Sequence, residues 1–247
     1  MSRKRAGLVI IGDEVLSARV PEANLSAVLE TFAKAGIESA EVAVLADDRA
    51  RIAAVVRDFI ARFDVVVTTG GVGPTHDDLT WAAVADAHGV ELVLRTDLLA
   101  MMEQRNGGPL SVEQQRMFML PAEASLEKVG GGYVIRMGDV WVLPGVPSMV
   151  AARIPYIASL YGSEPVCLAT LKFDVDEWDV IGAIDAIVAA HPQVDVGSYP
   201  IFDSQDHRLK LTFVADSRAL VATAVEDAIT RVGQSHWVDT TWSGGSQ

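Results

Sequence analysis

The first ninety residues constrain the fold most, because short β-branched runs alternate there with longer segments of helical periodicity. This alternation is typical of βαβ units around a parallel sheet. It predicts strands at 7–11, 41–45 and 64–68 and helices at 22–35, 49–63 and 77–88. Parallel strands end at one edge of their sheet, where open α/β sheets bind ligands. The residues that follow the three strands are therefore the first candidates for a functional site.

The rest of the chain has a different pattern. After residue 91 the alternation loosens, with helical pieces at 97–105 and 112–119. A hairpin is predicted at 133–143, and Pro144-Gly145-Val146-Pro147 should begin a helix ending near Tyr161. Beyond a Gly-Ser-Glu-Pro boundary at 162–165 the predicted order is strand, helix, strand, strand, helix, as in ferredoxin-like domains. We expect domains at 1–163 and 164–240 and a flexible tail at 241–247.

The composition argues against several classes of protein. Hydrophobic residues make up 50% of the 247, which is enough for a substantial core. The net charge of -13 argues against broad binding to nucleic acid or anionic membrane, which requires clustered Lys and Arg. The apolar stretch 7–11 behind Arg3-Lys4-Arg5 is too short for a signal peptide or a membrane span. We expect a cytoplasmic protein whose single cysteine, Cys167, is a buried structural thiol.

A glycine-rich loop follows the third predicted strand, with glycines at 70, 71 and 73. Glycine permits positive φ and close backbone approach, so successive N–H groups can point at one anion, and the helix behind the loop adds its dipole. The loop lacks the Gly-Lys-Ser/Thr ending of a Walker loop, and His76 stands where a dinucleotide fingerprint has its third glycine. The pattern predicts a phosphate site of another kind.

Each of the three predicted strands is followed by a pair of acidic residues. The pairs are Asp13-Glu14, Asp47-Asp48 and Asp77-Asp78. Carboxylates beside a phosphate repel it unless a divalent cation such as Mg²⁺ lies between them. Two alternatives stay open: Asp78 has the capping-box spacing from Thr75, and any one pair can be turn or helix-start chemistry. Three pairs at one sheet edge, beside a glycine loop, favour a site.

Other side chains are candidates on weaker grounds. His76 lies inside the loop without a second ligand at metal-binding spacing, so we expect it to be exposed. Trp81 could stack on a base or pterin, although packing in the core is the more common role. Arg116, Arg136 and Arg153 are candidates to neutralise a second phosphate, and the sequence does not rank them.

Together these motifs resemble the molybdopterin-binding (MoaB/Mog-like) domain as it occurs in competence/damage-inducible protein A (CinA). The resemblance is carried by Gly12-Asp13-Glu14 with Asn24, Asp47, the run Thr69 to Thr75 followed by Asp77-Asp78-Leu79-Thr80, and Leu143-Pro144-Gly145-Val146-Pro147. It covers about residues 6–161. Residues 166–232 look like the small domain that follows in CinA and in the N-terminal half of eukaryotic FAD synthases. The implied fold is a three-layer α/β/α domain with a mostly parallel sheet, followed by a small ferredoxin-like α+β domain.

The resemblance also implies roles for individual residues. Asp47 and Asp78 match the family's essential acidic positions and would be catalytic. Gly70, Gly71, Gly73 and Thr75 match its phosphate loop, and Gly12, Asn24, Pro144 and Gly145 are expected to bind the ligand. Asp13, Glu14, Asp77 and Asp78 are expected to hold a divalent metal, Mg²⁺ or Co²⁺.

The resemblance implies two different activities. Mog- and gephyrin-type members bind molybdopterin and adenylylate it, whereas CinA-type and FAD synthase-type members are linked to metal-dependent hydrolysis of ADP-ribose or FAD pyrophosphates. Pro147-Ser148-Met149, in place of Pro-Ser-Glu-Met, resembles the FAD synthase branch more closely. We favour a metal-dependent pyrophosphatase acting on a nucleotide diphosphate compound of the ADP-ribose or FAD type, with molybdopterin binding or adenylylation and a non-catalytic pterin- or nucleotide-binding module as alternatives. Family members commonly form oligomers, so a homodimer or homotrimer is expected.

Overall fold

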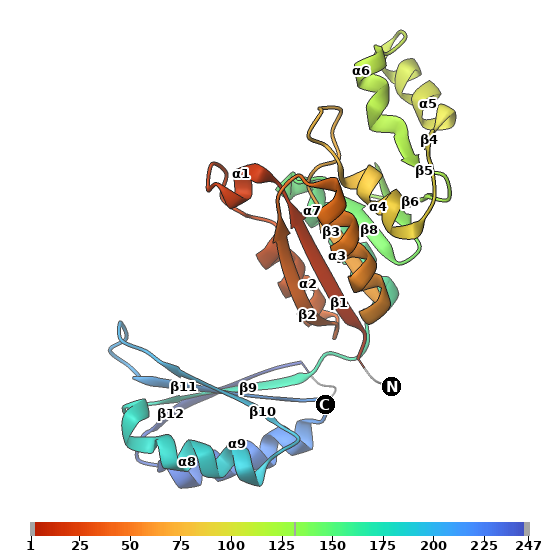
Figure 1. The fold of residues 1–247 in the computed structure, drawn as a ribbon. Coiled ribbons are helices and arrows are strands. Elements are labelled where there is room, and N and C mark those ends of the chain that lie inside the picture. Colours follow the sequence, from red (N-terminus) through yellow and green to blue (C-terminus); the bar gives the residue numbers. More distant parts are fainter. Residues whose placement is uncertain (1–2, 131, 245–247) are drawn as a thin grey trace. The chain divides into compact units, whose positions relative to one another are not determined.

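The computed structural model of the chain describes residues 3–130 and 132–244 (Figure 1). The chain divides into two compact units, Met1–Ser163 and Glu164–Gln247. Each unit has its own sheets and its own hydrophobic core, so each has the anatomy of a separate domain.

The first unit is built on a six-stranded sheet in the order β2-β1-β3-β8-β7-β6. Its strands are β1 (Arg5–Ile11), β2 (Glu38–Leu45), β3 (Val65–Thr69), β6 (Ser125–Val129), β7 (Gly132–Met137) and β8 (Val140–Leu143). The first three and β8 run parallel, and the β8-β7-β6 part is antiparallel. β1, β3 and β8 are buried along nearly their whole length, as expected for strands covered on both faces.

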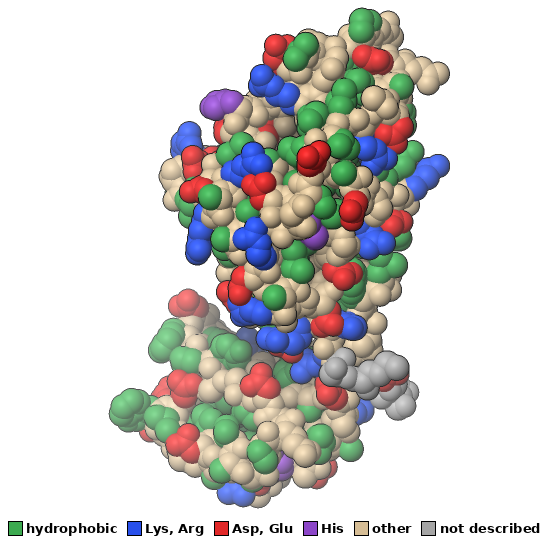
Figure 2. Space-filling model, turned by 45° about the vertical axis from the view of Figure 1, so that its right-hand side comes forward, with side chains coloured by type: hydrophobic (Ala, Val, Ile, Leu, Met, Phe, Trp, Pro, Cys, Tyr) green, Lys and Arg blue, Asp and Glu red, His purple; other side chains and the backbone are tan. Residues whose placement is uncertain are grey.

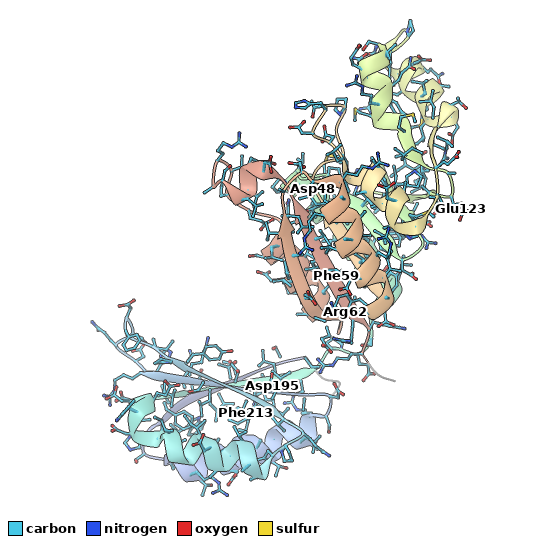
Figure 3. All side chains as sticks on the ribbon, in the orientation of Figure 1. Asp48, Phe59, Arg62, Glu123, Asp195 and Phe213 are labelled. Atoms are coloured by element: carbon cyan, nitrogen blue, oxygen red, sulfur yellow. The ribbon has the colours of Figure 1, made fainter. Side chains whose placement is uncertain are left out.

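Helices cover both faces of this sheet, which confirms the three-layer architecture. Helices α2 (Leu25–Lys34) and α7 (Pro147–Tyr161) pack together on one face. Helices α3 (Arg49–Arg62) and α4 (Thr80–His88) cover the other, where Phe59 of α3, labelled in Figure 3, packs against Gly7 of β1. The loops at the carboxyl ends of the parallel strands therefore leave a sheet that is packed on both faces.

A small insertion lies between α4 and β6. It contains β4 (Leu92–Leu94), α5 (Thr96–Asn106), α6 (Val112–Gln115), the 3₁₀ turn η1 (Arg116–Phe118) and β5 (Met119–Pro121). β4 and β5 pair as an antiparallel ribbon of their own. The sequence pattern predicted the helical pieces but neither this ribbon nor β6, because such short strands show too little alternation to be recognised.

Two helix starts differ from the prediction. A short helix α1 (Asp13–Leu16) follows β1, and α2 begins at Leu25 instead of residue 22. Helix α4 begins at Thr80, with Leu79 at its N-cap, and not at residue 77. Thr75 is therefore not a helix cap, and that alternative for Asp78 is wrong. The backbone at 75–78 forms a turn of its own, in which the N–H of Asp78 donates to the Thr75 carbonyl at 3.3 Å.

The second unit is a small α+β domain. Its elements are β9 (Cys167–Phe173), α8 (Glu177–Ala190), β10 (Asp195–Pro200), β11 (Leu209–Ala215), α9 (Arg218–Val232) and β12 (Trp237–Ser243). The strands form one antiparallel sheet in the order β10-β11-β9-β12, and the two helices pack together against it. This is the predicted ferredoxin-like arrangement with one more strand. Cys167 is fully buried in its core.

The flexible tail predicted at 241–247 is wrong for residues 241–243. These residues end β12, which pairs with β9. The run Val-Asp-Thr-Thr-Trp has the β-branched and aromatic side chains that favour strands, and an open edge of β9 is available to it. Residues 245–247 lie outside the described residues.

The surface mixes both signs of charge. Figure 2 shows Lys and Arg side chains interspersed with Asp and Glu over the face that it draws. Several form local ion pairs, such as Lys4 with Asp64 and Arg49 with Asp86. No helix among the described residues is both long enough and apolar enough to cross a membrane.

Candidate functional site at the carboxyl edge of the parallel sheet

Four loops meet where the parallel strands end. Gly12 follows β1, Asp47 lies shortly after β2, Gly70 follows β3 and Pro144 follows β8. Backbone hydrogen bonds tie these loops together. The Gly12 N–H donates to the last carbonyl of β2 at 3.0 Å, and the Gly70 N–H donates to the last carbonyl of β8 at 3.1 Å. The structure thus brings the candidate residues of all four loops to one edge.

The glycine loop packs too closely for side chains. Gly70 and Gly71 have φ angles of 96° and 63°. A Cβ on Gly70 would lie 2.1 Å from the Ile11 carbonyl oxygen, and one on Gly71 would lie 2.5 Å from the Thr80 hydroxyl. That hydroxyl donates to the Gly70 carbonyl at 2.8 Å, and the Thr80 N–H donates to the Gly71 carbonyl at 3.0 Å. The loop and the start of α4 are therefore one rigid piece.

This packing leaves three consecutive backbone donors. In the part of the chain that the structure describes, no hydrogen bond uses the N–H of Gly71, Val72 or Gly73. Free N–H groups in a glycine loop beside a helix N-terminus form an anion-binding concavity. The Gly70 N–H is already bonded to β8, so Gly70 shapes the loop and does not add a donor.

Asp78 and Thr75 close the loop upon itself. The Asp78 Oδ2 accepts from the Thr75 N–H at 2.8 Å and from the Thr75 hydroxyl. A Cβ on Gly73 would lie 2.6 Å from the same oxygen, so glycine there lets the carboxylate approach. Asp78 also lines the large pocket beside the loop. It therefore positions the loop with one oxygen and can present the other to a ligand.

Asp47 and Asp13 bind each other across the edge. The Asp13 N–H donates to the Asp47 Oδ2 at 2.9 Å, and the Asp47 N–H donates to the Asp13 Oδ1 at 3.3 Å. Burial raises the pKa of Asp47, and the nearby carboxylates of Asp13, Glu14 and Asp77 raise it further, against the lowering effect of the Asp13 N–H. Negative charge is therefore concentrated around Asp47, and a cation would relieve it.

The carboxylates do not form a complete metal cage. Across residues 3–130 and 132–244, no group of three or more His, Cys, Asp or Glu residues is placed to hold a metal ion. In phosphate sites Mg²⁺ is usually bound by one or two carboxylates, with substrate oxygens and water completing its shell. The crowded carboxylates around Asp47 supply hard oxygen ligands and excess negative charge, so they fit a cation held in that way.

A pocket of about 610 Å³ adjoins the loop. One wall is polar and consists of residues 70–73 with Glu14 and Asp78, and Pro144 and Gly145 lie beside it. The other walls are apolar and come from Trp81, the insertion and the β6-β7 hairpin. Trp81 is 9% exposed, so it packs in the core as expected and lines the pocket as well. The volume suits an organic ligand of nucleotide size.

Asn24 connects α2 to the loop after β8. Its Nδ2 donates to the Gly145 carbonyl at 3.0 Å. Gly145 in turn packs against Gly70, since a Cβ on Gly145 would lie 3.5 Å from the Gly70 Cα. Asn24, Gly145 and Gly70 therefore form one continuous wall.

The remaining candidate side chains, one histidine and three arginines, lie at different places in the structure. The side chain of His76 is 92% exposed. Arg136 pairs with Glu127 on β6, and Arg116 lines a separate pocket of about 280 Å³ beside Thr75 and His76. Arg153 alone among the three arginines lines the large pocket.

Sequence reasoning missed two contributors to the site. Thr80, which is fully buried, ties the loop to α4, and its signal was a threonine two residues after the acidic pair. The insertion supplies Met101, Met117 and Phe118 to the pocket. No sequence signal marks them, because only the tertiary fold brings the insertion to the loop.

Comparisons with known proteins place both parts of the chain in families. Residues 7–158 match a family described as a probable molybdopterin binding domain, and residues 165–241 match the middle domain of FAD synthase. A probable FAD synthase of Caenorhabditis elegans is 25% identical over 90% of this chain and 49% of its own length. A CinA-like protein of Citrifermentans bemidjiense is 38% identical over 58% of this chain and 37% of its own length. The chain thus spans half or less of these curated relatives.

A solved structure shares the fold. It is that of the protein CinA, of unknown function, from Thermoplasma acidophilum, with a TM-score of 0.58 and 27% identity. The similarity covers 64% of this chain and 98% of the other. The MoaB/Mog-like architecture expected from the motifs is confirmed.

Proposed function

We propose, from the fact that the chain belongs to the molybdopterin-binding domain family, that it is a divalent-metal-dependent pyrophosphatase acting on a nucleotide diphosphate compound of the ADP-ribose or FAD type. The match of residues 165–241 to the middle domain of FAD synthase supports a substrate of this type. So does the similarity to a probable FAD synthase along most of the chain.

The observation that carries the proposal is the run of free N–H groups at Gly71, Val72 and Gly73. Three donors in one loop, with Asp47 and Asp78 close by, suit a phosphate whose charge is shared with a cation. The pocket of about 610 Å³ beside the loop offers space for the organic part of the same molecule. The phosphate site, the acidic groups and the apolar pocket therefore lie next to one another.

Each residue has a role in this scheme. The loop N–H groups hold one phosphate and stabilise charge that develops on its oxygens. Asp78 keeps the loop closed through Thr75 with one oxygen, and its other oxygen would help to hold the cation. Asp47, with Asp13, Glu14 and Asp77 around it, would hold the cation, which when bound polarises the phosphoryl group and lowers the pKa of a water. Asp47 would also accept a hydrogen bond from the attacking water, whose oxygen forms a new bond to one phosphorus while the bond from that phosphorus to the bridging oxygen breaks and the second phosphate leaves with that oxygen.

The experiment is to incubate the full chain with ADP-ribose, with FAD, and with molybdopterin plus ATP, each with Mg²⁺ or Co²⁺, and to separate the products chromatographically. Release of AMP from ADP-ribose or FAD is the expected result. If no compound is turned over but one of them raises the melting temperature, the site binds its ligand and the proposed chemistry is wrong.

Two variants of Asp78 separate its structural and chemical roles. Asp78→Ala removes the acceptor for Thr75 and should abolish turnover by releasing the loop. Asp78→Asn keeps an oxygen acceptor for the loop but removes the charge. We expect Asp78→Asn to bind ADP in the absence of metal as wild type does, and to lose metal-dependent turnover. Full activity of either variant contradicts the role assigned to Asp78.

Adenylylation of molybdopterin is the second candidate, because the family of residues 7–158 is described as binding molybdopterin. It uses the same site, with a pterin phosphate in place of water as the nucleophile. Formation of adenylylated molybdopterin with release of pyrophosphate, without AMP from ADP-ribose or FAD, would favour it. A non-catalytic binding module predicts saturable binding that survives Asp47→Asn, with no product under any metal.

A further inference from the structure

The large pocket beside the glycine loop contains one cationic side chain. Among the described residues that line this pocket, Arg153 of α7 is the only Lys or Arg, whereas Glu14 and Asp78 contribute carboxylates. The chain as a whole has a net charge of -13, so positive charge is scarce in it. Arg153 is therefore the group on the pocket wall that can attract an anion by its charge.

The protein holds the Arg153 side chain in place but does not neutralise it. The Arg153 Nε donates to the Tyr133 carbonyl at 3.0 Å, and its Nη1 donates to the Met149 carbonyl, also at 3.0 Å. Within the part of the chain that the structure describes, no carboxylate pairs with Arg153 and its Nη2 makes no hydrogen bond. A guanidinium has five N–H donors, so Arg153 keeps its charge and the donors of Nη2 for another partner.

A glycine on β7 leaves room for the free end of this guanidinium. A Cβ on Gly132 would lie 3.0 Å from the Arg153 Nη2, which is closer than ordinary van der Waals contact. The Nη2 therefore lies beside the first residue of β7, between a strand and a helix that each supply it with a carbonyl anchor. Because the guanidinium is already oriented, little conformational freedom is lost when it binds an anion.

The register of the sheet places this guanidinium relative to the glycine loop. β8 runs parallel to β3 and antiparallel to β7, so the start of β7 lies at the same edge as the ends of β3 and β8. Neighbouring strands are about 4.8 Å apart, which puts the start of β7 roughly 10 Å from the loop after β3. A pyrophosphate with a hydrogen bond at each end spans a distance of this size.

We propose that Arg153 binds the second phosphate of the substrate's pyrophosphate, while the N–H groups of the glycine loop hold the first. The inference rests on the proposed function, which puts one phosphate at the loop. A planar guanidinium forms paired hydrogen bonds to phosphate oxygens, and these are stronger than bonds between neutral groups. In the proposed hydrolysis the second phosphate leaves with the bridging oxygen, so Arg153 also stabilises the charge that develops on it.

The other two arginine candidates are less suited to this role. Arg136 of β7 already pairs with Glu127, and it does not line the pocket. Arg116 is exposed and lines the separate pocket of about 280 Å³. Among the described residues no hydrogen bond holds the Arg116 side chain, so its position is not fixed as that of Arg153 is.

Four variants separate the proposed contact from a general effect of charge. Arg153→Gln removes the charge but keeps an amide that can donate to a carbonyl. Arg153→Lys keeps the charge and lacks the planar fork. Arg136→Gln removes one positive charge outside the pocket and is the matched control. Arg116→Gln tests the rival position beside the loop.

The test is the affinity of the full chain for ADP and for AMP, measured by isothermal titration calorimetry in EDTA so that no divalent cation contributes to the difference. We expect wild type to prefer ADP by about tenfold or more, as hydrogen bonds to a charged group would give. Arg153→Gln should lose most of this preference by weakening ADP binding, with little change for AMP. Arg153→Lys should keep an intermediate preference, and Arg136→Gln and Arg116→Gln should keep the preference in full.

Several results would overturn the proposed contact. Equal affinity of wild type for ADP and AMP does so whatever the variants show, and so does the absence of any ADP binding. A full preference for ADP in Arg153→Gln does so too, as does a loss in Arg136→Gln as large as in Arg153→Gln. Equal weakening of ADP and AMP in Arg153→Gln would mean that Arg153 only joins β7 to α7. A loss in Arg116→Gln alone would put the second phosphate in the smaller pocket.

The same measurements distinguish this inference from the proposed function. A preference for ADP that depends on Arg153, without release of AMP from ADP-ribose or FAD, supports the phosphate contact and contradicts the pyrophosphatase. Release of AMP by a wild-type protein that binds ADP and AMP equally supports the pyrophosphatase and contradicts the contact.

Discussion

At the scale of single residues, the carboxylate of Asp47 carries a charge that the fold disfavours. Burial and the surrounding carboxylates raise its pKa above the unfolded value. The folded state then binds the proton more tightly than the unfolded state, so the free energy of unfolding falls as pH rises from the unfolded pKa through the folded one. At neutral pH the ionised Asp47 therefore lowers the free energy of unfolding. Charged groups that destabilise the fold in this way are often found at functional sites.

Replacing Asp47 by Asn should stabilise the protein and inactivate it. The amide keeps an oxygen for the Asp13 N–H but removes the charge, so the melting temperature at pH 7 and low salt should rise while turnover of ADP-ribose or FAD is lost. The control is Asp48→Asn, since Asp48 is an exposed N-cap that accepts from the Arg51 N–H and Asn caps equally well. A melting temperature lowered in Asp47→Asn alone would show that its charge is not repelled.

At the scale of elements, the glycine loop depends on contact between backbones. Gly70→Ala should lower the free energy of unfolding by about 2–4 kcal/mol, because its Cβ would meet a main-chain oxygen that cannot move aside. Gly108→Ala is the control, because nothing lies within 4 Å of the added Cβ, and its effect should stay within about 0.5 kcal/mol. Urea unfolding of both variants measures the difference, and similar costs would show that the loop can relax.

Helix α7 is joined to the sheet by the hydroxyl of a half-buried tyrosine, Tyr161. Tyr161 donates to Asp139 at 2.7 Å and accepts from the Trp141 indole at 3.1 Å. Burial, and then the bond to the Asp139 carboxylate, raise the pKa of Tyr161 to about 12. The unfolded tyrosine titrates near 10, so the stability that Tyr161 contributes is complete below about pH 10 and is lost between about pH 10 and 12.

Tyr161→Phe should therefore change the pH dependence as well as the stability. At pH 7 we expect a loss of about 1–2 kcal/mol, because Asp139 and Trp141 lose their partner. Above pH 10 the variant should unfold with a shallower dependence on pH than wild type. Denaturant midpoints between pH 7 and 11.5 measure both effects, and an equal alkaline slope in the two proteins would contradict the shifted pKa.

At the scale of the whole molecule, the two units should fold independently. The core of each is made only of its own residues, and every candidate site residue lies in Met1–Ser163. Residues 1–163 and 164–247, expressed separately, should each unfold cooperatively, and 1–163 should retain ADP binding. Circular dichroism melts and calorimetry check this. A first unit that is unfolded by itself, or folded but unable to bind ADP, would show that the site needs the second.

The sequence by itself determined the alternation of parallel strands and helices and indicated candidate residues for the site, but it did not reveal α1, the β4-β5 ribbon, β6 or β12. Alternation of β-branched and helical segments indicated the parallel sheet, because periodicity is a local property that needs no tertiary contact. The glycine loop and the acidic pairs were recognisable for the same reason, because the types of residue and their spacing along the chain are enough to indicate a phosphate site.

Only the tertiary structure decided how those residues are used. The sequence allowed Asp78 to be a helix cap. In the structure α4 begins at Thr80, and the Asp78 carboxylate instead accepts a hydrogen bond from Thr75 in the loop. The raised pKa of Asp47 depends first on its burial and then on the carboxylates that two other loops bring near it. The anchoring of Arg153 by two carbonyls and the pocket built with the insertion exist only once distant segments meet. Burial, repulsion and cavity shape are properties of contacts, which sequence spacing does not contain.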